Sequence, residues 1–265
     1  MEADLLTCAG PSITGAATTI AVTATAPALG YAPGVDEQEI RKSAALEQRH
    51  WWYAERRELV RRVVGPLPRG RALDVGCGGG GNTGVLRDLG WDVTGLEYSP
   101  VAARLARSRD LGIVRGDARR LPIADASMDL VMSTDMWEHI DDDAAVARET
   151  VRVLRPGGRA LVAVPAGMDL WSGHDVALGH VRRYDREGLA RVMEEAGLQV
   201  VDIRSWNVLL RPVARMRRKH NDSDSEMEQV HPVVNAALRL TVATERYLPV
   251  HRLPGISLVA RAVKP

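Results

Sequence analysis

Phenylalanine is absent from this sequence, and cysteine occurs only at Cys8 and Cys77. One cysteine lies in an Ala/Thr-rich N-terminal segment and the other in a glycine-rich turn, so we expect no disulfide framework. Without phenylalanine, Trp, Tyr, Leu and Val must fill the core and line any aromatic pocket. No stretch of about 18 consecutive apolar residues occurs, which argues against a membrane span.

A strong charge of either sign is also lacking. The formal net charge is +1, from 35 Lys and Arg against 34 Asp and Glu. No strong field therefore favours nucleic acid or an anionic membrane as a partner. Residues 14–29 are apolar enough to suggest a signal peptide, but Glu2 and Asp4 precede them in place of a basic region. We therefore expect a cytoplasmic protein that binds neither nucleic acid nor a membrane.

Composition divides the chain into an arm and a domain. Residues 1–35 are rich in Ala, Thr, Gly and Pro without a sustained period, so we expect a flexible arm. Whether this arm joins the subunits of a homo-oligomer is left open. The remaining residues, 36–265, are expected to form a single domain. Its parts are a helical lid at 36–64, a core at 70–166, loops and helices at 167–250, and a last strand at 256–263.

Short apolar runs alternate with amphipathic stretches through this domain, which indicates an α/β fold. Strands that alternate with helices form a mostly parallel sheet with helices on both faces. The polar segment 211–230 is expected to be a mobile insertion before the last strand. The other predicted strands cover residues 72–75, 92–96, 113–114, 128–133, 159–164 and 198–203.

A glycine-rich turn follows the first of these strands. Gly76, Gly78 and Gly81 have the GxGxxG spacing, in which glycines let the backbone approach a ligand closely. Glu97 ends the next strand about 20 residues further on, where a carboxylate can accept both ribose hydroxyls. Asp117 follows the third strand and is placed to accept an adenine amino group. The turn and Glu97 suit NAD as well as S-adenosylmethionine, so both cofactors stay open on these residues alone.

Six motifs then stand in order between residues 70 and 166. They are LDVGCGGG at 73–80, GLEYSP at 95–100, GDARRLP at 116–122, MDLV at 128–131, WEHI at 137–140 and LRPGG at 154–158. In this order and spacing the chain resembles the class I S-adenosylmethionine-dependent methyltransferases, particularly the small-molecule branch often called type 11. The resemblance implies a Rossmann-like sandwich with seven strands in the order 3-2-1-4-5-7-6. The seventh strand, at 256–263, would be antiparallel to its neighbours.

The resemblance also implies the cofactor and its contacts. The cofactor would be S-adenosylmethionine, with S-adenosylhomocysteine as the product. Residues of the turn would face its methionine part: Asp74, Gly76, Cys77, Gly78 and Gly80. The remaining contacts would be Glu97 on the ribose, Tyr98 on an adenine face, Asp117 and Ala118 on the adenine edge, and Ser133, Thr134 and Asp135 at the sulfonium end.

The acceptor site is harder to predict. A narrower subset of the same branch, without a single agreed substrate, is similar in the segments 50–57, 171–175, 179–184 and 253–258. Glu138, His139 and His180 are the candidate catalytic residues, because their segments should open at the carboxyl end of the sheet and an acceptor hydroxyl or acidic carbon needs a base. As an alternative, Glu138 and His139 support the cofactor loop, and His180 braces its own loop. We expect no metal site.

Tryptophans suggest the character of the acceptor. Five of the six lie in segments that should converge over the cofactor, which predicts an aromatic-walled pocket; ordinary packing in a chain without phenylalanine is the alternative. Arg182 and Arg183 raise a second alternative, an acceptor with a phosphate or carboxylate group, although an intramolecular ion pair explains them as well. The candidate acceptor residues are Trp51, Trp52, Tyr53, Trp137, Trp171, His174, Arg182, Arg183, Tyr184 and Trp206.

The sequence therefore predicts an enzyme that methylates a small molecule, an apolar or aromatic specialised metabolite. O-, N- and C-methylation, and methylation coupled to cyclisation, all remain open. An NAD-dependent oxidoreductase would explain the turn and Glu97 but not Asp117, the WEHI motif or the Pro156-Gly157-Gly158 turn in register. A repurposed, non-methylating S-adenosylmethionine-binding protein is the other alternative. Nucleic-acid methylation is not expected, because Ser133-Thr134-Asp135-Met136 stands where such enzymes carry an Asn/Asp-Pro-Pro-aromatic tetrapeptide.

Overall fold

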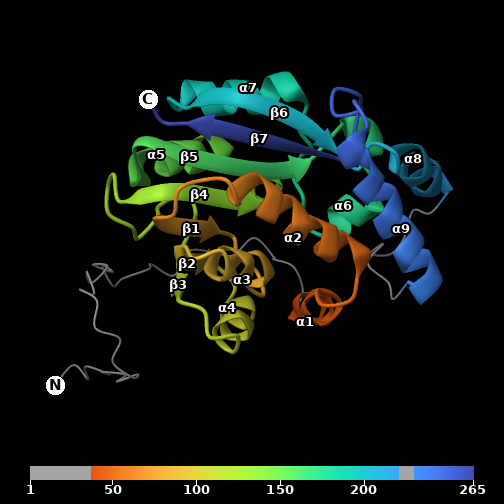
Figure 1. Ribbon diagram of the computed structural model, residues 1–265, viewed down its shortest axis with the longest axis horizontal. Coiled ribbons are helices and arrows are strands. Elements are labelled where there is room, and N and C mark those ends of the chain that lie inside the picture. The colour runs from red at the N-terminus through yellow and green to blue at the C-terminus, as the bar shows by residue number, and fades with distance from the viewer. Residues whose placement is uncertain (1–36, 221–229) are drawn as a thin grey trace.

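A seven-stranded sheet runs through the centre of the structure (Figure 1). The computed structural model describes residues 37–220 and 230–265, so the arm predicted at 1–35 lies outside the described residues. The strand order is β3-β2-β1-β4-β5-β7-β6, and only β7 runs antiparallel to the strands beside it. The strands are β1 (Arg71–Val75), β2 (Asp92–Glu97), β3 (Ile113–Arg115), β4 (Met128–Thr134), β5 (Leu154–Pro165), β6 (Gln199–Trp206) and β7 (Ser257–Val263). The predicted fold class and strand order are therefore confirmed.

Both faces of the sheet are buried, which is why its central strands are apolar almost without interruption. Successive residues of a strand point to opposite faces. Leu73 and Val75 of β1 belong to the core on one face, whereas Ala72 belongs to the core on the other. Helices α5 (Asp143–Val153) and α7 (Arg186–Glu195) cover the first face.

Helices α2 (Trp51–Val64), α3 (Gly81–Asp88) and α9 (Pro232–Thr244) contribute to the second core. Figure 1 shows α2 crossing in front of β1 and β4. The remaining helical segments connect these layers. They are α1 (Glu37–Leu46), α4 (Pro100–Arg107), α6 (Gly173–Ala177) and α8 (Arg211–His220), with the short 3-10 turns η1 (Trp137–His139), η2 (Met168–Leu170) and η3 (Glu245–Tyr247).

The helical lid predicted at 36–64 consists of α1 and α2, and it is tied to α9 from the far end of the chain. Asn235 accepts a hydrogen bond from the Trp51 backbone N–H at 2.8 Å. The buried carboxylate of Glu55 on α2 accepts bonds from Arg239 and Arg246, at 3.1 and 2.8 Å. Charge-assisted bonds of this kind stabilise an interface more than neutral ones. The lid is therefore part of the same folded body as the C-terminal helix.

Two boundaries differ from the sequence prediction. Residues 211–220 were expected in a mobile insertion but form α8, because Arg211 donates to both carboxylate oxygens of Asp169 and Arg218 donates to the Leu170 carbonyl. Strand β5 begins at Leu154 rather than 159, and Gly157 and Gly158 exchange backbone hydrogen bonds with Lys264. In both places a partner distant in sequence supplies the stabilising contacts.

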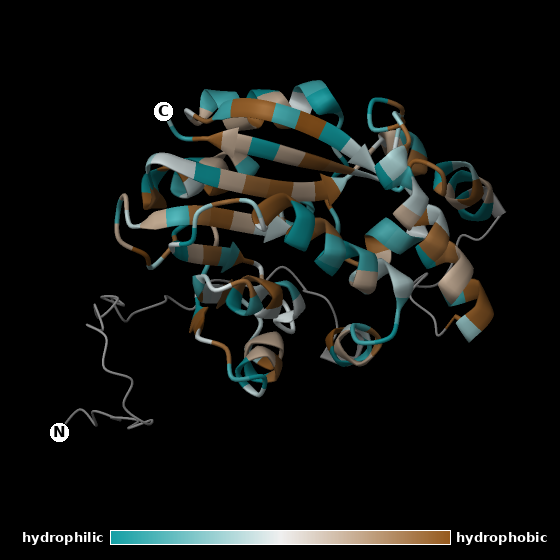
Figure 2. Cartoon of the chain, viewed as in Figure 1, coloured by the Kyte–Doolittle hydropathy of each residue, from teal (hydrophilic) through white to brown (hydrophobic). Residues whose placement is uncertain are grey.

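Apolar side chains also reach the surface on α9. Val233 and Leu240 are 70% and 67% exposed, and Figure 2 shows the hydrophobic residues along this helix. Within the described residues, none of the helices has the length and apolar character that a membrane span requires.

Candidate cofactor and acceptor site

The glycine turn joins the end of β1 to the start of α3. Gly76, Gly78 and Gly80 all have positive φ, at 74°, 55° and 86°, a region that glycine enters without a Cβ clash. A Cβ on Gly76 would overlap Met136, at 2.8 Å from its Cβ, whereas a Cβ on Gly78 would meet nothing within 4 Å. The turn is therefore packed from below at Gly76 and open at Gly78.

Glu97 at the end of β2 is fastened to this turn. Its carboxylate accepts a hydrogen bond from the Gly78 N–H at 2.8 Å and another from the Ser99 N–H at 2.8 Å. Burial raises the pKa of Glu97, while the bonds from the Ser99 and Gly78 backbone act in the opposite direction. The carboxylate thus sits beside the turn in a fixed orientation, and Tyr98 follows it half-buried.

Asp74 and Cys77 lie beneath the turn. Asp74 is buried and accepts a hydrogen bond from the Thr83 hydroxyl at 2.7 Å, but its Oδ1 has no hydrogen-bond partner among the described residues. Burial raises the pKa of Asp74 to about 7. The Cys77 thiol packs against Gly95, and burial raises its pKa, so it remains a protonated thiol.

Asp117 and Ala118 follow β3, at the predicted adenine edge. The Asp117 carboxylate is already bound by Arg119, whose Nη2 lies 2.6 Å from Oδ2. Burial acts to raise the pKa of Asp117, but the hydrogen bonds from Arg119 outweigh it and hold the pKa below its ordinary value. Ala118 is buried in the core. An adenine amino group would therefore share Asp117 with Arg119.

The end of β4 carries Ser133, Thr134 and Asp135. Ser133 is buried with its hydroxyl unpartnered among the described residues, and Thr134 accepts a hydrogen bond from Asn82 at 3.0 Å. Asp135 has a φ of 54° and pairs with Arg56 of α2, Nη2 to Oδ2 at 2.7 Å. The helical lid is thus joined to the sheet edge that the sequence predicted for the sulfonium.

Arg56 is a site residue that the sequence analysis did not assign, although it stands in the quoted segment 50–57. Its side chain is 2% exposed, and its guanidinium lies 5.3 Å from the Trp52 ring and 4.7 Å from the Trp206 ring. Its Nε and Nη1 have no hydrogen-bond partner among the described residues. A buried cation held between two aromatic faces, with donors to spare, is suited to bind an anionic group.

The three candidate catalytic residues come together. The His139 and His180 rings are 4.7 Å apart in an edge-to-face arrangement, and His180 Nε2 lies 3.9 Å from Glu138 Oε1. Glu138 is completely buried, which raises the pKa of its carboxyl well above the ordinary value. Burial, aided by the nearby His180, lowers the pKa of His139 to about 4.

Asp175 of α6 organises this group, and the sequence analysis missed it. Its buried carboxylate contacts His180 Nδ1 at 2.8 Å and accepts hydrogen bonds from Arg183 Nε at 2.8 Å and the Ser172 N–H at 3.0 Å. Burial acts to raise the pKa of Asp175, but these partners, His180 first, hold it at about 2. The only indication in the sequence was its place five residues before His180.

The basic residues predicted near the acceptor have partners within the chain. Arg182 pairs with Asp143 at 2.6 Å, and the Tyr184 hydroxyl donates to the same carboxylate at 2.7 Å. Arg183 is held by Asp175 and also donates to the Ala166 carbonyl. These contacts favour a bracing role for the 182–184 segment over recognition of an anionic acceptor.

The predicted aromatic residues separate into two groups. Trp51, Trp52 and Trp206 form a cluster. The ring centroids of Trp51 and Trp52 are 5.6 Å apart, and those of Trp52 and Trp206 are 4.9 Å apart. Tyr53 is beside them on α2, and burial raises its pKa to about 12. Trp137 instead is 1% exposed in the opposite core. Trp171 lies half-buried between η2 and α6, and His174 lies half-buried within α6.

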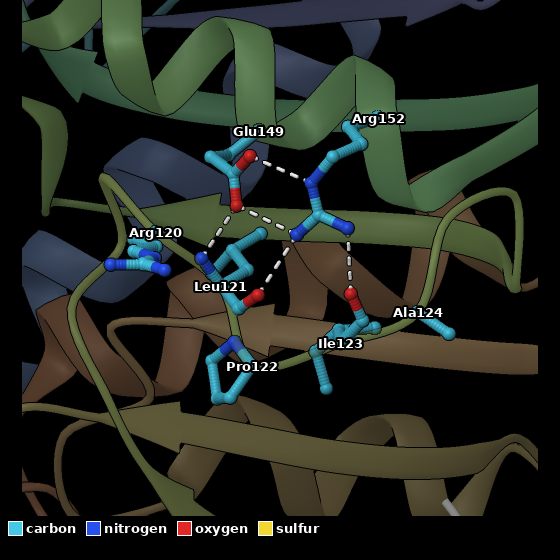
Figure 3. A pocket seen from close by; sticks show the side chains of 7 residues that line it. All are labelled: Arg120, Leu121, Pro122, Ile123, Ala124, Glu149 and Arg152. Carbon is cyan, nitrogen blue, oxygen red and sulfur yellow. Dashed lines mark hydrogen bonds and ion pairs between the residues drawn. The ribbon is translucent and has the colours of Figure 1, made fainter. Parts of the chain in front are cut away.

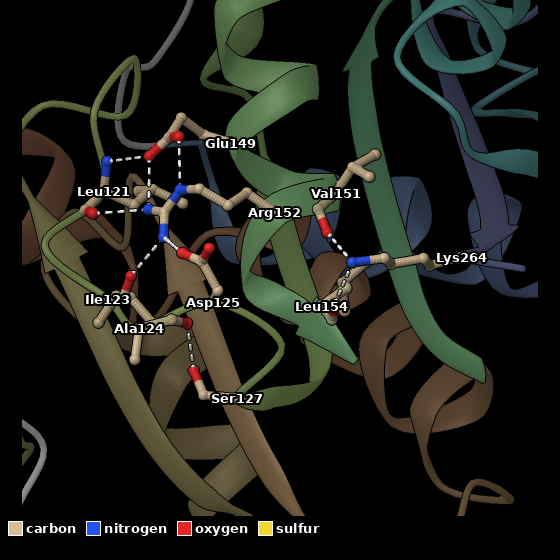
Figure 4. Close-up of polar contacts among 10 residues, drawn as sticks. All are labelled: Leu121, Ile123, Ala124, Asp125, Ser127, Glu149, Val151, Arg152, Leu154 and Lys264. Atoms are coloured by element: carbon tan, nitrogen blue, oxygen red, sulfur yellow. Dashed lines mark hydrogen bonds and ion pairs between the residues drawn. The ribbon is translucent and has the colours of Figure 1, made fainter. Parts of the chain in front are cut away.

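A surface pocket of about 440 Å³ lies elsewhere, between the 120–124 loop and α5 (Figure 3). Its polar groups bind one another: Arg152 donates to the carbonyls of Leu121 and Ile123 and to Glu149 (Figure 4). Glu149 in turn accepts a hydrogen bond from the Leu121 N–H at 2.6 Å. These hydrogen bonds hold the 120–124 loop against α5, so we interpret the pocket as a structural feature of this contact.

Comparison with known proteins agrees with this architecture. The Methyltransferase domain family matches residues 73–162. A Mycolicibacterium smegmatis protein named "Probable S-adenosylmethionine-dependent methyltransferase" is 31% identical over 166 residues, which cover 61% of this chain and 65% of that protein. The chain thus spans slightly less than two thirds of that relative.

Two solved structures share the fold. Phosphoethanolamine N-methyltransferase 2 of Haemonchus contortus, in complex with S-adenosyl-L-methionine, has a TM-score of 0.61 at 18% identity, covering 87% of this chain and 57% of that one. The [4+2]-cyclase SpnF has a TM-score of 0.56 at 21% identity, covering 88% and 97%. The glycine turn with its carboxylate, the strand order and the family match define one class of protein. Residues 73–162 match the Methyltransferase domain family, and the fold is that of the class I S-adenosylmethionine-dependent methyltransferases.

Proposed function

We propose that this chain transfers the methyl group of S-adenosylmethionine to a small-molecule acceptor. One observation carries the proposal. At the carboxyl ends of β1 and β2, the Glu97 carboxylate accepts a hydrogen bond from the Gly78 N–H at 2.8 Å, beside a glycine turn that is open at Gly78. A carboxylate in this place accepts ribose hydroxyls, and the open turn admits the methionine part of the cofactor.

The other residues fit the same cofactor. Asp74 has an unpartnered oxygen under the turn, and the two unpartnered nitrogens of Arg56 suit the methionine carboxylate. Ser133, Thr134 and Asp135 would line the sulfonium end. Tyr98 would cover adenine, and Asp117 with Ala118 would meet its edge. When bound, S-adenosylmethionine supplies an electrophilic methyl group.

Methyl transfer is an in-line displacement, so correct positioning supplies much of the acceleration. The acceptor atom must also lose a proton in many such reactions. Glu138, His139 and His180 are the residues we propose for acceptor activation, because they meet at the carboxyl end of the sheet. Since Asp175 holds His180 Nδ1, the Nε2 of that ring is directed toward Glu138 and the interior of the cluster.

An apolar or aromatic acceptor is favoured by the cluster of Trp51, Trp52 and Trp206 on the lid side of the site. The bracing contacts of Arg182 and Arg183 speak against an anionic one. Single replacement of Trp51 or Trp52 by alanine should raise the acceptor KM with little change in kcat. An unchanged KM in both variants would exclude the aromatic wall.

A repurposed protein that binds the cofactor without transferring methyl remains the second candidate. SpnF shares this fold and is a [4+2]-cyclase, and one fold commonly supports different reactions. The two candidates differ in the product, because only a methyltransferase converts S-adenosylmethionine into S-adenosylhomocysteine in step with its acceptor.

Calorimetric titration of the purified chain with S-adenosylhomocysteine, and separately with NAD, tests the proposal. We expect micromolar binding of S-adenosylhomocysteine, lost in Glu97→Ala, and no binding of NAD. Glu194→Ala, which removes an exposed carboxylate on α7, is the matched control and should bind as the wild type does. Binding of NAD alone would overturn the proposal. An acceptor screen with isotopically labelled S-adenosylmethionine then separates the methyltransferase from the repurposed protein.

A further inference from the structure

The Glu138 carboxylate is not hydrogen-bonded to any other described residue. It is completely buried, and neither of its oxygens has a hydrogen-bond partner among the described residues. Among the cations of neighbouring elements, Arg183 pairs with Asp175 at 2.8 Å and Arg56 with Asp135 at 2.7 Å, and neither has a hydrogen bond to Glu138. A buried polar group in this state is costly, so a proton or a further cation must lie beside it.

One of the two histidines next to it, His180, is anchored through its ring. Asp175 Oδ1 lies 2.8 Å from His180 Nδ1, and the opposite nitrogen of that ring, Nε2, lies 3.9 Å from Glu138 Oε1. The ring of His139 packs edge-to-face against the His180 ring, with the centroids 4.7 Å apart. Histidines that bind metals show the arrangement of His180, in which an outer acceptor fixes the tautomer and leaves the other nitrogen for the ion.

We propose that Glu138, His139 and His180 bind one divalent transition-metal ion, Zn²⁺ being the best match. One ligand atom from each residue lies within 4.8 Å of the other two. Two imidazoles and one carboxylate form known catalytic zinc sites and non-haem iron sites, whereas Mg²⁺ and Ca²⁺ prefer oxygen ligands. This proposal departs from the sequence analysis, which expected no metal.

Binding of an ion requires the ligand atoms to approach one another. Ligand atoms on a tetrahedral zinc ion, with bonds of about 2.0–2.1 Å, are roughly 3.3 Å apart. The 3.9 Å between Glu138 Oε1 and His180 Nε2 therefore has to shorten by about 0.6 Å, and no pair of ligand atoms, all within 4.8 Å of one another, has to shorten by more than about 1.5 Å.

The site lies mostly inside the fold. Glu138 is buried and the His180 side chain is 8% exposed, whereas His139 is half-buried. A three-ligand site leaves a fourth position for water or for an oxygen of the acceptor. That role in acceptor activation rests on the function proposed above, whereas binding of the ion does not.

Metal binding is measured on the full-length chain without a histidine tag, after removal of metals with a chelator. Zn²⁺ is titrated by calorimetry, and Co²⁺ is added separately to read its visible absorption bands. We expect one ion per chain and the bands of a low-symmetry Co²⁺ site. Glu138→Gln, His139→Ala and His180→Ala should each weaken Zn²⁺ binding by about tenfold or more. His251→Ala, at an exposed histidine far along the chain, is the control and should match the wild type.

Binding of S-adenosylhomocysteine by each sample shows that it is folded and tests the cofactor site separately. A wild-type chain that binds S-adenosylhomocysteine but takes up no stoichiometric Zn²⁺ and gives no Co²⁺ bands would overturn the metal site. Glu138 then carries a proton. Equal Zn²⁺ affinity in all variants would also overturn it. Stoichiometric metal without S-adenosylhomocysteine binding would support the metal site and count against the proposed function. If the variants do not fold, the wild-type stoichiometry and Co²⁺ spectrum decide.

Discussion

Replacement of Gly78 by alanine should weaken cofactor binding and lower the stability of the fold only moderately. Gly78 has a φ of 55°, and a Cβ there would meet nothing within 4 Å. The left-handed backbone costs an alanine about 1–2 kcal/mol, so the free energy of unfolding should fall by about that amount. The open space over Gly78 is where we place the methionine part of the cofactor. A methyl group in that space should weaken S-adenosylhomocysteine binding by about tenfold or more, which corresponds to about 1.4 kcal/mol.

Gly76→Ala is the matched variant, because it shares the left-handed backbone but not the open space. Its φ is 74°, and its Cβ would lie 2.8 Å from the Cβ of Met136. Overpacking of a buried position typically costs about 1–3 kcal/mol. Added to the backbone strain, this predicts a loss of about 2–5 kcal/mol in the free energy of unfolding.

Urea unfolding, followed by far-UV circular dichroism, measures the free energy of unfolding of both variants. Calorimetric titration measures their affinity for S-adenosylhomocysteine. Equal losses of stability in the two variants would refute the distinction between a packed and an open position. A Gly78→Ala protein that binds S-adenosylhomocysteine as tightly as the wild type would refute the placement of the cofactor over the turn.

Three further predictions concern buried polar groups. Because burial raises the pKa of Asp74 to about 7, ionisation favours the unfolded chain as the pH rises from about 4 to about 7. Relative to Asp74→Asn, the wild type should therefore lose up to about 4 kcal/mol of unfolding free energy between pH 4 and pH 8, and parallel pH curves in urea unfolding would contradict this. Tyr184→Phe removes the hydroxyl that donates to Asp143, so the unfolding free energy should fall by about 1–2 kcal/mol. The acceptor KM should not change. A changed KM would place Tyr184 in the acceptor site. Arg56→Lys should weaken S-adenosylhomocysteine binding by about tenfold in calorimetry, because lysine lacks the planar guanidinium group. Arg61→Lys, on the exposed side of α2, is the control and should leave the affinity unchanged. Equal affinities in the two variants would remove Arg56 from the cofactor site.

Much of the fold followed from local features of the sequence. Each apolar run between glycine or proline breaks became a strand, and the motif order implied the reversed last strand. The prediction failed where stability comes from distant partners. The polar composition of 211–220 suggested a mobile segment, but Arg211 pairs with Asp169, 42 residues earlier, and α8 forms. No periodicity in the sequence contains that information.

The same division applies to the site. The sequence by itself determined the glycine turn and its partner, since the turn with Gly78 follows β1 and Glu97 ends the adjacent parallel strand β2, so they meet at the carboxyl end of the sheet. Only the tertiary structure paired Arg56 with Asp135 and placed His180 beside Glu138. Strand order fixes where backbone ends meet, whereas these side chains come from a lid helix and a long loop, whose positions depend on packing across the whole fold.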